Sequence, residues 1–475
     1  MSTLVARLLT ALWIMLGIIH HVGVHCAEKH ICLCTTIGGI SHSRWLFEIG
    51  NVLIERGYHV TYITDEYNAQ FATGYPNLDV QAILPPTTAI YPNNTIFTSL
   101  DEVAMWKSLE KVLKSGYDAS YDTMMAFFEK HSPAMVVCDM MLDFCADAAS
   151  DYGAPIAITS TSTMIHRQQS LCRGIPFLLQ WPCRHLMRLW YPFLWKDNKA
   201  HALKLINNYF GLEPAQDFDP LTHMVGPILP EHQEHASNLS NAETQFLATH
   251  TKVVLVAFGQ HQLFHLDAQE TASLDTALQE HQRCGNVDGV IWVTREKHNV
   301  CNNQLSTTTR SLDSMCVEWI DQHAILHHPA VRLFISHGGS GGLHESLDAA
   351  TPLFLFPSMA DQIPNAKQLQ AEGVARWHPR ATAAAAGAGK MDIQRIIEDL
   401  EFLLSSDNAP LQDSLKRHKT LVDLGKRRKH YAADLLEELV LASNDHGRLE
   451  HRIKKANMSL INTLLSWFQN RHCCT

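Results

Sequence analysis

One continuous segment decides the fold class: Trp319–Gln362, WIDQHAILHHPAVRLFISHGGSGGLHESLDAATPLFLFPSMADQ. Within it, the apolar run Val331–Ser336 predicts a buried parallel strand. The small residues of 337–342 break the strand before a helix that begins near Leu343. Such a loop lets a ligand approach the backbone, and the free N–H groups of a helix start favour a phosphate. The loop matches neither the P-loop nor GxGxxG, which disfavours ATP hydrolysis and NAD binding.

The alternation of strand and helix extends outward from this segment in both directions. Further apolar runs predict strands at Val253–Phe258, Gly289–Thr294 and Pro352–Pro357. Helical spacing follows at Asp392–Leu404, Leu411–Leu424 and Ala432–Ala442. An earlier block predicts strands at His30–Thr36, His59–Thr64, Met135–Asp139 and Pro155–Thr159, with helices at Trp45–Glu55 and Leu142–Tyr152. The alternation predicts two Rossmann-like α/β domains, each a parallel sheet with helices on both faces.

The Pro-rich, weakly periodic stretch 212–248 predicts the linker between the domains. We expect four parts along the chain: a signal peptide 1–26, a first domain 27–240, a second domain 241–445 and a helical tail 446–475. Open α/β sheets bind ligands beyond the carboxyl ends of their strands. Both domains should therefore point their loops into a cleft between them.

The composition excludes several classes of protein. With 475 residues, 46% of them hydrophobic and 18% charged, the chain is globular and long enough for more than one domain. Its formal net charge of −10 argues against nucleic acid as a partner, because phosphate backbones need a basic field. The 12 cysteines are too sparse for a disulfide scaffold, and the 29 histidines are unusually many.

The N-terminus predicts entry into the secretory pathway. Arg7 precedes an apolar core that ends near Ile19, and small residues lead to Cys26 and Ala27, the layout of a cleavable signal peptide. An uncleaved membrane anchor is the alternative, but the core is short for a membrane span. We therefore expect residence in the endoplasmic reticulum lumen or secretion, with three glycosylation sequons at Asn93, Asn238 and Asn457. For a disulfide we favour Cys172 with Cys183.

The C-terminal stretch Met458–Gln469 is amphipathic and follows basic residues. It predicts either peripheral membrane contact or a terminal helix docked on the protein.

The segment Trp319–Gln362 resembles the signature box of the UDP-dependent glycosyltransferases of family 1, without a gap. The similarity continues outward through Val225–Pro227, Val253–Gly259 and Ile291–Trp292, and reaches Ser41–His42 and Glu55–Val60. It covers most of the mature chain and is most specific in the C-terminal half. It implies a GT-B-like fold, in which the first domain binds the acceptor and the second binds UDP-sugar.

The resemblance also implies roles for the matching residues. Trp319 would stack on uracil, Gln322 would lie near the ribose, and Glu345 would accept from the ribose hydroxyls. The diphosphate would be bound by His337, Ser340 and the loop amides around Gly339 and Gly341. Asp361 and Gln362 would bind the hydroxyls of the sugar.

Two positions depart from the family pattern. Asp321 stands where the family usually has Pro, and Gly341 stands where most members have an Asn that contacts the donor. The loss of that side chain predicts weaker donor binding or a different sugar preference.

His42 with Asp139 is the predicted catalytic pair. Transfer to a hydroxyl needs a base, and a histidine titrates near the operating pH. His42 follows a strand and a Gly-Gly turn, and Asp139 ends another strand of the same sheet, so the carboxylate could orient the imidazole. The family has this His at the matching place and an Asp near this strand end. Asp143, one helical turn further on, is the alternative partner.

The predicted reaction is direct displacement at the anomeric carbon with inversion and release of UDP. It needs no metal or other cofactor. Asp217-Phe218-Asp219 resembles a metal motif of another glycosyltransferase fold, but it lies in the linker and we interpret it as chance. CxxC and HExxH patterns are absent from the sequence, and the adjacent His327 and His328 should point to different faces.

The acceptor and the sugar stay open at this stage. Apolar stretches at Ile175–Trp181 and Leu189–Trp195 favour a small lipophilic acceptor. Glucose, glucuronate, xylose and N-acetylglucosamine all remain candidates for the sugar. Two other functions compete with the transferase: a non-catalytic UDP-sugar-binding protein, suggested by Gly341, and a sugar-nucleotide epimerase.

Overall fold

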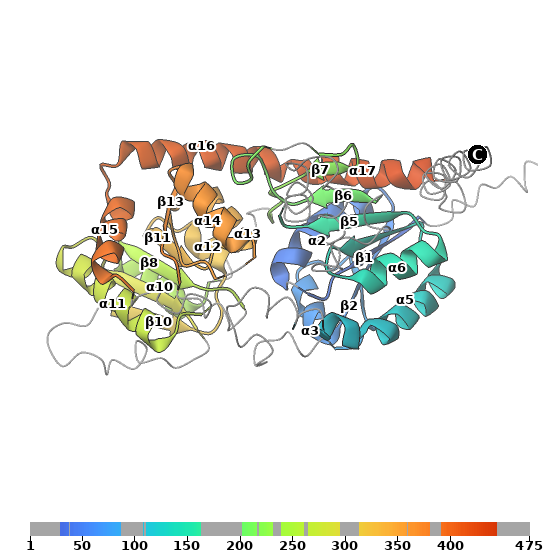
Figure 1. Cartoon of the computed structure of the whole chain (residues 1–475), viewed down its shortest axis with the longest axis horizontal. Coiled ribbons are helices and arrows are strands. Elements are labelled where there is room, and N and C mark those ends of the chain that lie inside the picture. Colours follow the sequence, from blue (N-terminus) through green and yellow to red (C-terminus); the bar gives the residue numbers. More distant parts are fainter. Residues whose placement is uncertain are drawn as a thin grey trace, which may run out of the picture.

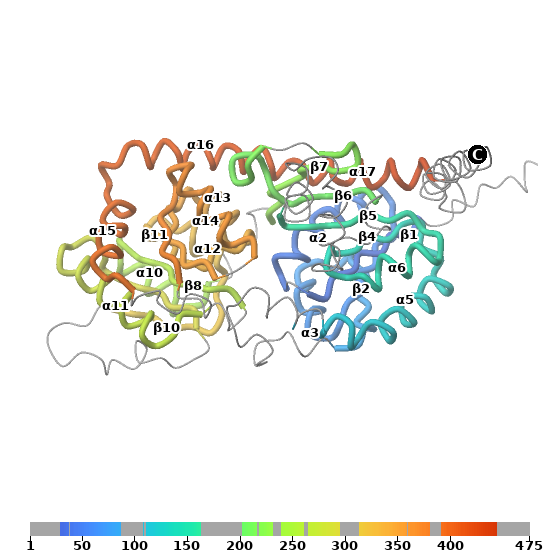
Figure 2. Tube along the Cα trace, viewed as in Figure 1, coloured from blue at the N-terminus to red at the C-terminus, as the bar shows by residue number. Residues whose placement is uncertain are grey.

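A computed structural model of the chain shows two α/β domains side by side, joined along one edge by two long helices (Figures 1 and 2). The residues that it describes are 29–37, 39–86, 108, 111–162, 202–215, 218–230, 239–260, 265–294, 313–358, 360–380 and 391–443. The predicted signal peptide, the three sequon asparagines, the Cys172–Cys183 pair, the apolar stretches 175–195 and the tail 446–475 lie outside these residues.

The first domain is built on a seven-stranded sheet in the order β3-β2-β1-β4-β5-β6-β7, in which every pairing is parallel. In chain order the strands are β1 His30–Cys34, β2 His59–Thr64, β3 Asp79–Ala82, β4 Met135–Asp139, β5 Ile156–Ser160, β6 Leu203–Ile206 and β7 Thr222–Met224. Ile31 and Leu33 face one hydrophobic cluster while Cys32 and Cys34 face another. Successive residues of a strand point to opposite faces, so both faces of this sheet are covered.

The helices of the first domain follow the strands as the alternation predicts. They are α2 Ile40–Glu55, α3 Glu66–Ala69 with the short 3-10 turn η1 Gln70–Ala72, α5 Tyr117–His131 and α6 Asp143–Tyr152. Gly39 stands at the start of α2 with φ of 66°, a left-handed conformation that glycine adopts without steric cost. That turn sets the direction in which the first residues of α2 leave the sheet.

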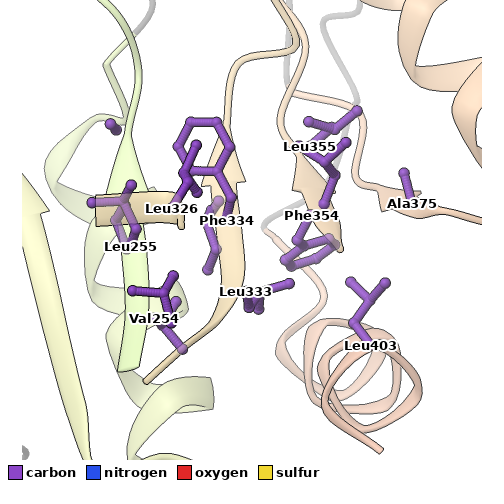
Figure 3. Packing of buried hydrophobic residues seen from close by; sticks show 14 of the residues in the cluster. Val254, Leu255, Leu326, Leu333, Phe334, Phe354, Leu355, Ala375 and Leu403 are labelled. Carbon is purple, nitrogen blue, oxygen red and sulfur yellow. The ribbon is translucent and has the colours of Figure 1, made fainter. Parts of the chain in front are cut away.

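The second domain contains a six-stranded sheet in the order β10-β9-β8-β11-β12-β13, again parallel at every pairing. The strands are β8 Val253–Ala257, β9 Gly289–Val293, β10 Asp313–Val317, β11 Val331–Ser336, β12 Leu353–Leu355 and β13 Ala375–Trp377. Figure 3 shows Phe334 of β11 beside Leu326, while Leu333 and Phe354 turn toward Leu403. This sheet is therefore also buried between helical layers.

The helices around the second sheet are α10 Asn241–Thr249, α11 Ala268–Arg283, α12 Gln322–Leu326, α13 Ser340–Asp348, α14 Gln362–Ala371 and α15 Ile393–Leu404. α10 and α11 begin with reciprocal capping boxes, Ser240 with Glu243 and Asp267 with Glu270. Each box satisfies N–H groups that a helix start leaves without an intrahelical acceptor.

Two further helices cross from the second domain to the first. α16 Ala409–Lys426 contacts α13, and α17 Arg428–Ala442 packs on α2 (Figure 1). Ala432, Ala433 and Leu436 of α17 belong to the same buried cluster as Ile31 of β1. The domain division at residues 240 and 445 stays a prediction, but the structure adds that α17 completes the core of the first domain.

The segment between the domains holds more structure than its polar composition predicts. Part of the stretch 212–248 forms β7 at the edge of the first sheet and α10 beside the second. Among the helices of the described ranges, none has both the length and the hydrophobicity that a membrane span requires.

Candidate active site

His42 and Asp139 meet at the carboxyl end of the first sheet. His42 lies in the first turn of α2, and its Nδ1 is 2.6 Å from Oδ2 of Asp139, the last residue of β4. A carboxylate oxygen at this distance accepts, so Nδ1 carries the hydrogen and the neutral ring keeps its lone pair on Nε2. The arrangement supplies an oriented base.

Asp139 is itself held in place. Its Oδ1 accepts from the backbone N–H of Met141 at 2.9 Å, and its side chain is 2% exposed. A disulfide between Cys138 and Cys145 ties the residue before it to α6. The carboxylate therefore has one orientation, toward His42. Sequence analysis did not foresee this disulfide, because the spacing of two cysteines does not reveal their pairing.

The charge state of His42 depends on both domains. Burial acts to lower the pKa of His42, but the charge and hydrogen bond of Asp139 raise it, and Asp361 of the second domain raises it further. The net pKa lies above the ordinary value for histidine. Asp361 is therefore close enough to His42 for its charge to be felt across the domain boundary.

Ser340, Asp361 and Asn365 form a connected group beside the glycine-rich loop. Ser340 Oγ donates to Asp361 Oδ2 at 2.8 Å, and Asn365 Nδ2 lies 3.2 Å from the same oxygen and 3.1 Å from the Gly338 carbonyl. Burial raises the pKa of Asp361, although these donors and His42 act to lower it. The group joins the start of α13 to the start of α14.

His337 occupies a narrow space between two glycines. If Gly259 carried a side chain, its Cβ would lie 2.9 Å from the His337 imidazole. A Cβ added at Gly339 would lie 2.5 Å from Nε2 of the same ring. His337 Nδ1 is 3.3 Å from the hydroxyl of Ser336. The two glycines therefore make room for an imidazole at the end of β11, where a phosphate would meet the start of α13.

Gln322 and Glu345 face each other on neighbouring helices. Gln322 Nε2 donates to Glu345 Oε2 at 2.5 Å, which joins α12 to α13. Trp319, just after β10, is 54% exposed, unusual for so large an aromatic residue. The exposed indole can stack on a planar ring, and the Glu345 carboxylate can accept from a diol.

Gln362 is fixed by the loop that follows β12. Its Oε1 accepts from the backbone N–H of Ser358 at 2.8 Å. Arg380 donates to the Ser358 hydroxyl at 2.8 Å and forms an ion pair with Glu270. This buried arginine was missed by sequence analysis, because nothing near residue 380 marks it as part of the site.

The two domains touch directly beside His42. A Cβ at Gly341 would lie 3.0 Å from Cβ of Ser41, and one at Gly39 would overlap the side-chain amide of Gln260. Both polar atoms of the Gln260 amide are buried without a hydrogen-bond partner among the described residues. Gln260 is a further site candidate that sequence analysis did not single out, and its position directly after Gly259 was the available signal.

The predicted site residues lie in two groups, one in each domain, and the groups meet where Gly341 faces Ser41, the residue before His42. The first group is His42 and Asp139, and the second is Trp319, Gln322, His337, Gly339, Ser340, Gly341, Glu345, Asp361 and Gln362. Their roles in binding and catalysis stay predictions. Asp219 of the linker motif instead accepts from Leu221 and Thr222 and pairs with Lys204, whereas Asp217 is outside the described residues.

Comparison with known proteins gives this geometry a family context. A sequence profile described as UDP-glucoronosyl and UDP-glucosyl transferase matches residues 193–391. UDP-glycosyltransferase stmC of Aspergillus ustus is 23% identical over 510 aligned residues, which cover 93% of this chain and 92% of that protein.

Solved structures agree on the fold. Phytolacca americana UGT2, complexed with UDP-2fluoro-glucose and pterostilbene, has a TM-score of 0.61 at 17% identity, covering 87% of this chain and 99% of that one. A Polygonum tinctorium UDP-glucosyltransferase capable of glucosylating indoxyl has a TM-score of 0.64 at 16% identity, covering 86% and 99%. The architecture is that of the GT-B glycosyltransferases.

Proposed function

The chain belongs to the UDP-glycosyltransferase family and is a sugar-transferring enzyme, and from this premise we propose its specific reaction. It moves a hexose or uronic acid from UDP-sugar to the hydroxyl of a small lipophilic acceptor, with inversion at the anomeric carbon. Two structural relatives are named with small acceptors, pterostilbene and indoxyl, which supports this class of acceptor.

His42 is the general base of this reaction. As the acceptor oxygen attacks the anomeric carbon, the bond from that carbon to the diphosphate oxygen breaks, and the hydroxyl proton passes to His42 Nε2. Asp139 holds Nδ1 and stabilises the imidazolium that forms. UDP leaves with the bonding electrons. The scheme uses no metal.

The second domain binds the donor. Trp319 stacks on uracil, and Gln322 and Glu345 bind the ribose. His337, Ser340 and the backbone amides near Gly339 and Gly341 stabilise the developing charge of the leaving diphosphate. Asp361 and Gln362 bind the sugar hydroxyls. The observation that carries the proposal is that His42, paired with Asp139, lies at the domain boundary where Gly341 of the glycine-rich loop approaches Ser41.

The test is a donor screen by mass spectrometry, in which several UDP-sugars and a mixed acceptor pool are offered to the full chain. His42→Ala should lower turnover by about 10²–10⁴-fold, the usual worth of a general base. UDP affinity, measured by calorimetry, should stay unchanged. His59→Ala is the matched control, because His59 is a half-exposed histidine at the opposite end of the first sheet. Unchanged turnover in His42→Ala would remove the proposed base.

A second candidate is a UDP-sugar-binding protein without turnover, which Gly341 favours because the usual donor-contacting Asn is absent. Binding of UDP without consumption of any donor in the screen would establish it. Conversion of the donor into an epimeric sugar without any acceptor would instead identify an epimerase.

We also propose that the protein resides in the secretory pathway. The Cys138–Cys145 disulfide supports an oxidising compartment, since such bonds are rare in the cytosol. N-terminal sequencing of the protein from cells would detect cleavage near Cys26. A mobility shift after glycosidase treatment would report use of the sequons. Contact of residues 458–469 with a membrane stays a prediction that vesicle flotation can check.

A further inference from the structure

Three side chains that no step of the reaction uses converge below the predicted ribose site. His323 of α12 and His327, directly after α12, both direct Nε2 toward Oδ2 of Asp348, at 2.8 Å and 3.4 Å. Asp348 is the last residue of α13 and is fully buried. Each of the three side chains offers one possible ligand atom, and these three atoms lie within 4.8 Å of one another.

The backbone fixes the orientation of His327. Its Nδ1 lies 2.9 Å from the carbonyl oxygen of His323. A carbonyl only accepts, so Nδ1 must carry the hydrogen, and the neutral ring then presents its Nε2 lone pair to the Asp348 carboxylate. A lone pair and a carboxylate oxygen repel each other unless a cation lies between them. That cation is either a proton on His327 or a metal ion.

The second oxygen of the Asp348 carboxylate, Oδ1, faces two lysines. Lys426 contacts Asp348 Oδ1, and Lys419 lies 3.8 Å from the same atom. Asp423 pairs with both lysines at 3.5 Å, which offsets part of their positive charge. Oδ2 therefore faces the two imidazoles while Oδ1 is bound by an ammonium. Metal-bound carboxylates are typically held by such outer hydrogen bonds.

We propose that His323, His327 and Asp348 bind a divalent transition cation of the Zn²⁺ type, through the two Nε2 atoms and Oδ2. Two imidazoles and one carboxylate, with the histidines four residues apart, are a ligand set that suits this class of ion. His323 then carries its hydrogen on Nδ1, and a water completes the coordination. The His327 side chain is 26% exposed, which gives the ion a route from solvent.

The ion would clamp two helices that carry the donor residues. His323 directly follows Gln322, and Asp348 lies one helical turn after Glu345, so the site forms a second link between α12 and α13 in addition to the Gln322–Glu345 bond. This site takes no part in the displacement, and its occupancy is measured without any substrate.

The test uses the full chain, stripped with a chelator and dialysed at pH 7.5 against Zn²⁺ or Co²⁺. Wild type should bind one more ion than His327→Gln and show the visible absorption of Co²⁺ bound by nitrogen and oxygen. Asp348→Asn should lower Zn²⁺ affinity at least tenfold. His430→Gln, which removes an exposed histidine of α17, is the matched control and should behave as wild type.

His327→Gln keeps the test informative if Asp348→Asn fails to fold, because His327 is partly exposed. Equal stoichiometry and affinity in wild type and His327→Gln would overturn the proposal. A wild-type chain that binds no metal ion at this pH would also overturn it, because no metal ion would then lie between His327 and Asp348.

Discussion

At the scale of single residues, the His42–Asp139 pair predicts the pH dependence of the reaction. A base works only when it is neutral, so kcat/KM should fall as the pH drops through the pKa of His42, which Asp139 and Asp361 raise above its ordinary value. Asp139→Asn removes the charge that raises this pKa and leaves the burial that lowers it. The acid limb of the pH profile should therefore move to lower pH, and the rate should fall by at least about tenfold.

The measurement is kcat/KM from pH 5 to 9, with Asp143→Asn as the control on the neighbouring carboxylate. Asp143→Asn should leave the acid limb where it is. If the acid limb moves for Asp143→Asn and not for Asp139→Asn, Asp143 orients His42 and the prediction is wrong.

Gly341 has a structural reason for its departure from the family pattern. A Cβ there would lie 3.0 Å from Cβ of Ser41, which directly precedes His42. Gly341→Asn should therefore displace the base and lower kcat by at least about tenfold, a typical cost of misplacing a catalytic group. Ser41→Gly in the same chain removes the opposing Cβ and should restore most of the rate. Steady-state kinetics of the two single variants and the double variant would check this, and no rescue would refute the steric explanation.

The sequence alone identified the candidate catalytic pair of the site, but it did not identify several side chains that contact the site. His42 and Asp139 could be placed together because both follow strands whose carboxyl ends share one edge of a parallel sheet. The Gln260 amide, the Asn365 contact and the buried Arg380 could not be found in this way. Each depends on how separate loops or the two domains pack, and local pattern carries no information about that packing.

At the scale of elements, most central strands were predictable and the edge strands were not, although the buried strand β6 was also missed. β2, β4 and β11 have the predicted bounds because each is rich in apolar and β-branched residues and is buried along most of its length. β3 (DVQA) and β10 (DSMCV) are short or partly exposed and begin with an aspartate, so neither resembles a buried strand. Their strand conformation depends on hydrogen bonding to the neighbouring strand, β2 for β3 and β9 for β10.

α16 packs so closely on the interdomain segment that one of its residues must be glycine. A Cβ at Gly425 would lie 2.3 Å from Cδ of Pro227 and 2.7 Å from the carbonyl oxygen of Gly226. Gly425→Ala should therefore cost about 1–3 kcal/mol of unfolding free energy, as overpacking does, even though alanine favours a helix. Gly116→Ala, at a helix start with open space around it, should change stability by less than about 0.5 kcal/mol. Urea unfolding of both variants would distinguish packing from propensity.

At the scale of the whole molecule, contacts of the C-terminal helices and of α13 fix the position of one domain relative to the other. Arg56, directly after α2, pairs with Asp434 and Glu437 of α17, and the Tyr58 hydroxyl donates to Glu437 at 2.9 Å. His344 of α13 lies 3.3 Å from Asn208 of the first domain, and burial lowers the pKa of His344 to about 3, so it bridges the domains as a neutral donor. These contacts place His42 opposite the donor loop.

Because α17 completes the core of the first domain, a change in this distant helix should weaken that domain and leave the second intact. Leu436 is fully buried against the first domain, whereas Leu441 of the same helix is 64% exposed. Leu436→Ala should cost about 2–5 kcal/mol through lost burial and a cavity, and Leu441→Ala should cost less than about 0.5 kcal/mol. Calorimetry with and without UDP would separate the domains, because UDP stabilises only the domain that binds it. Equal losses in the two variants, or a loss confined to the UDP-stabilised transition, would show that α17 does not belong to the first domain's core.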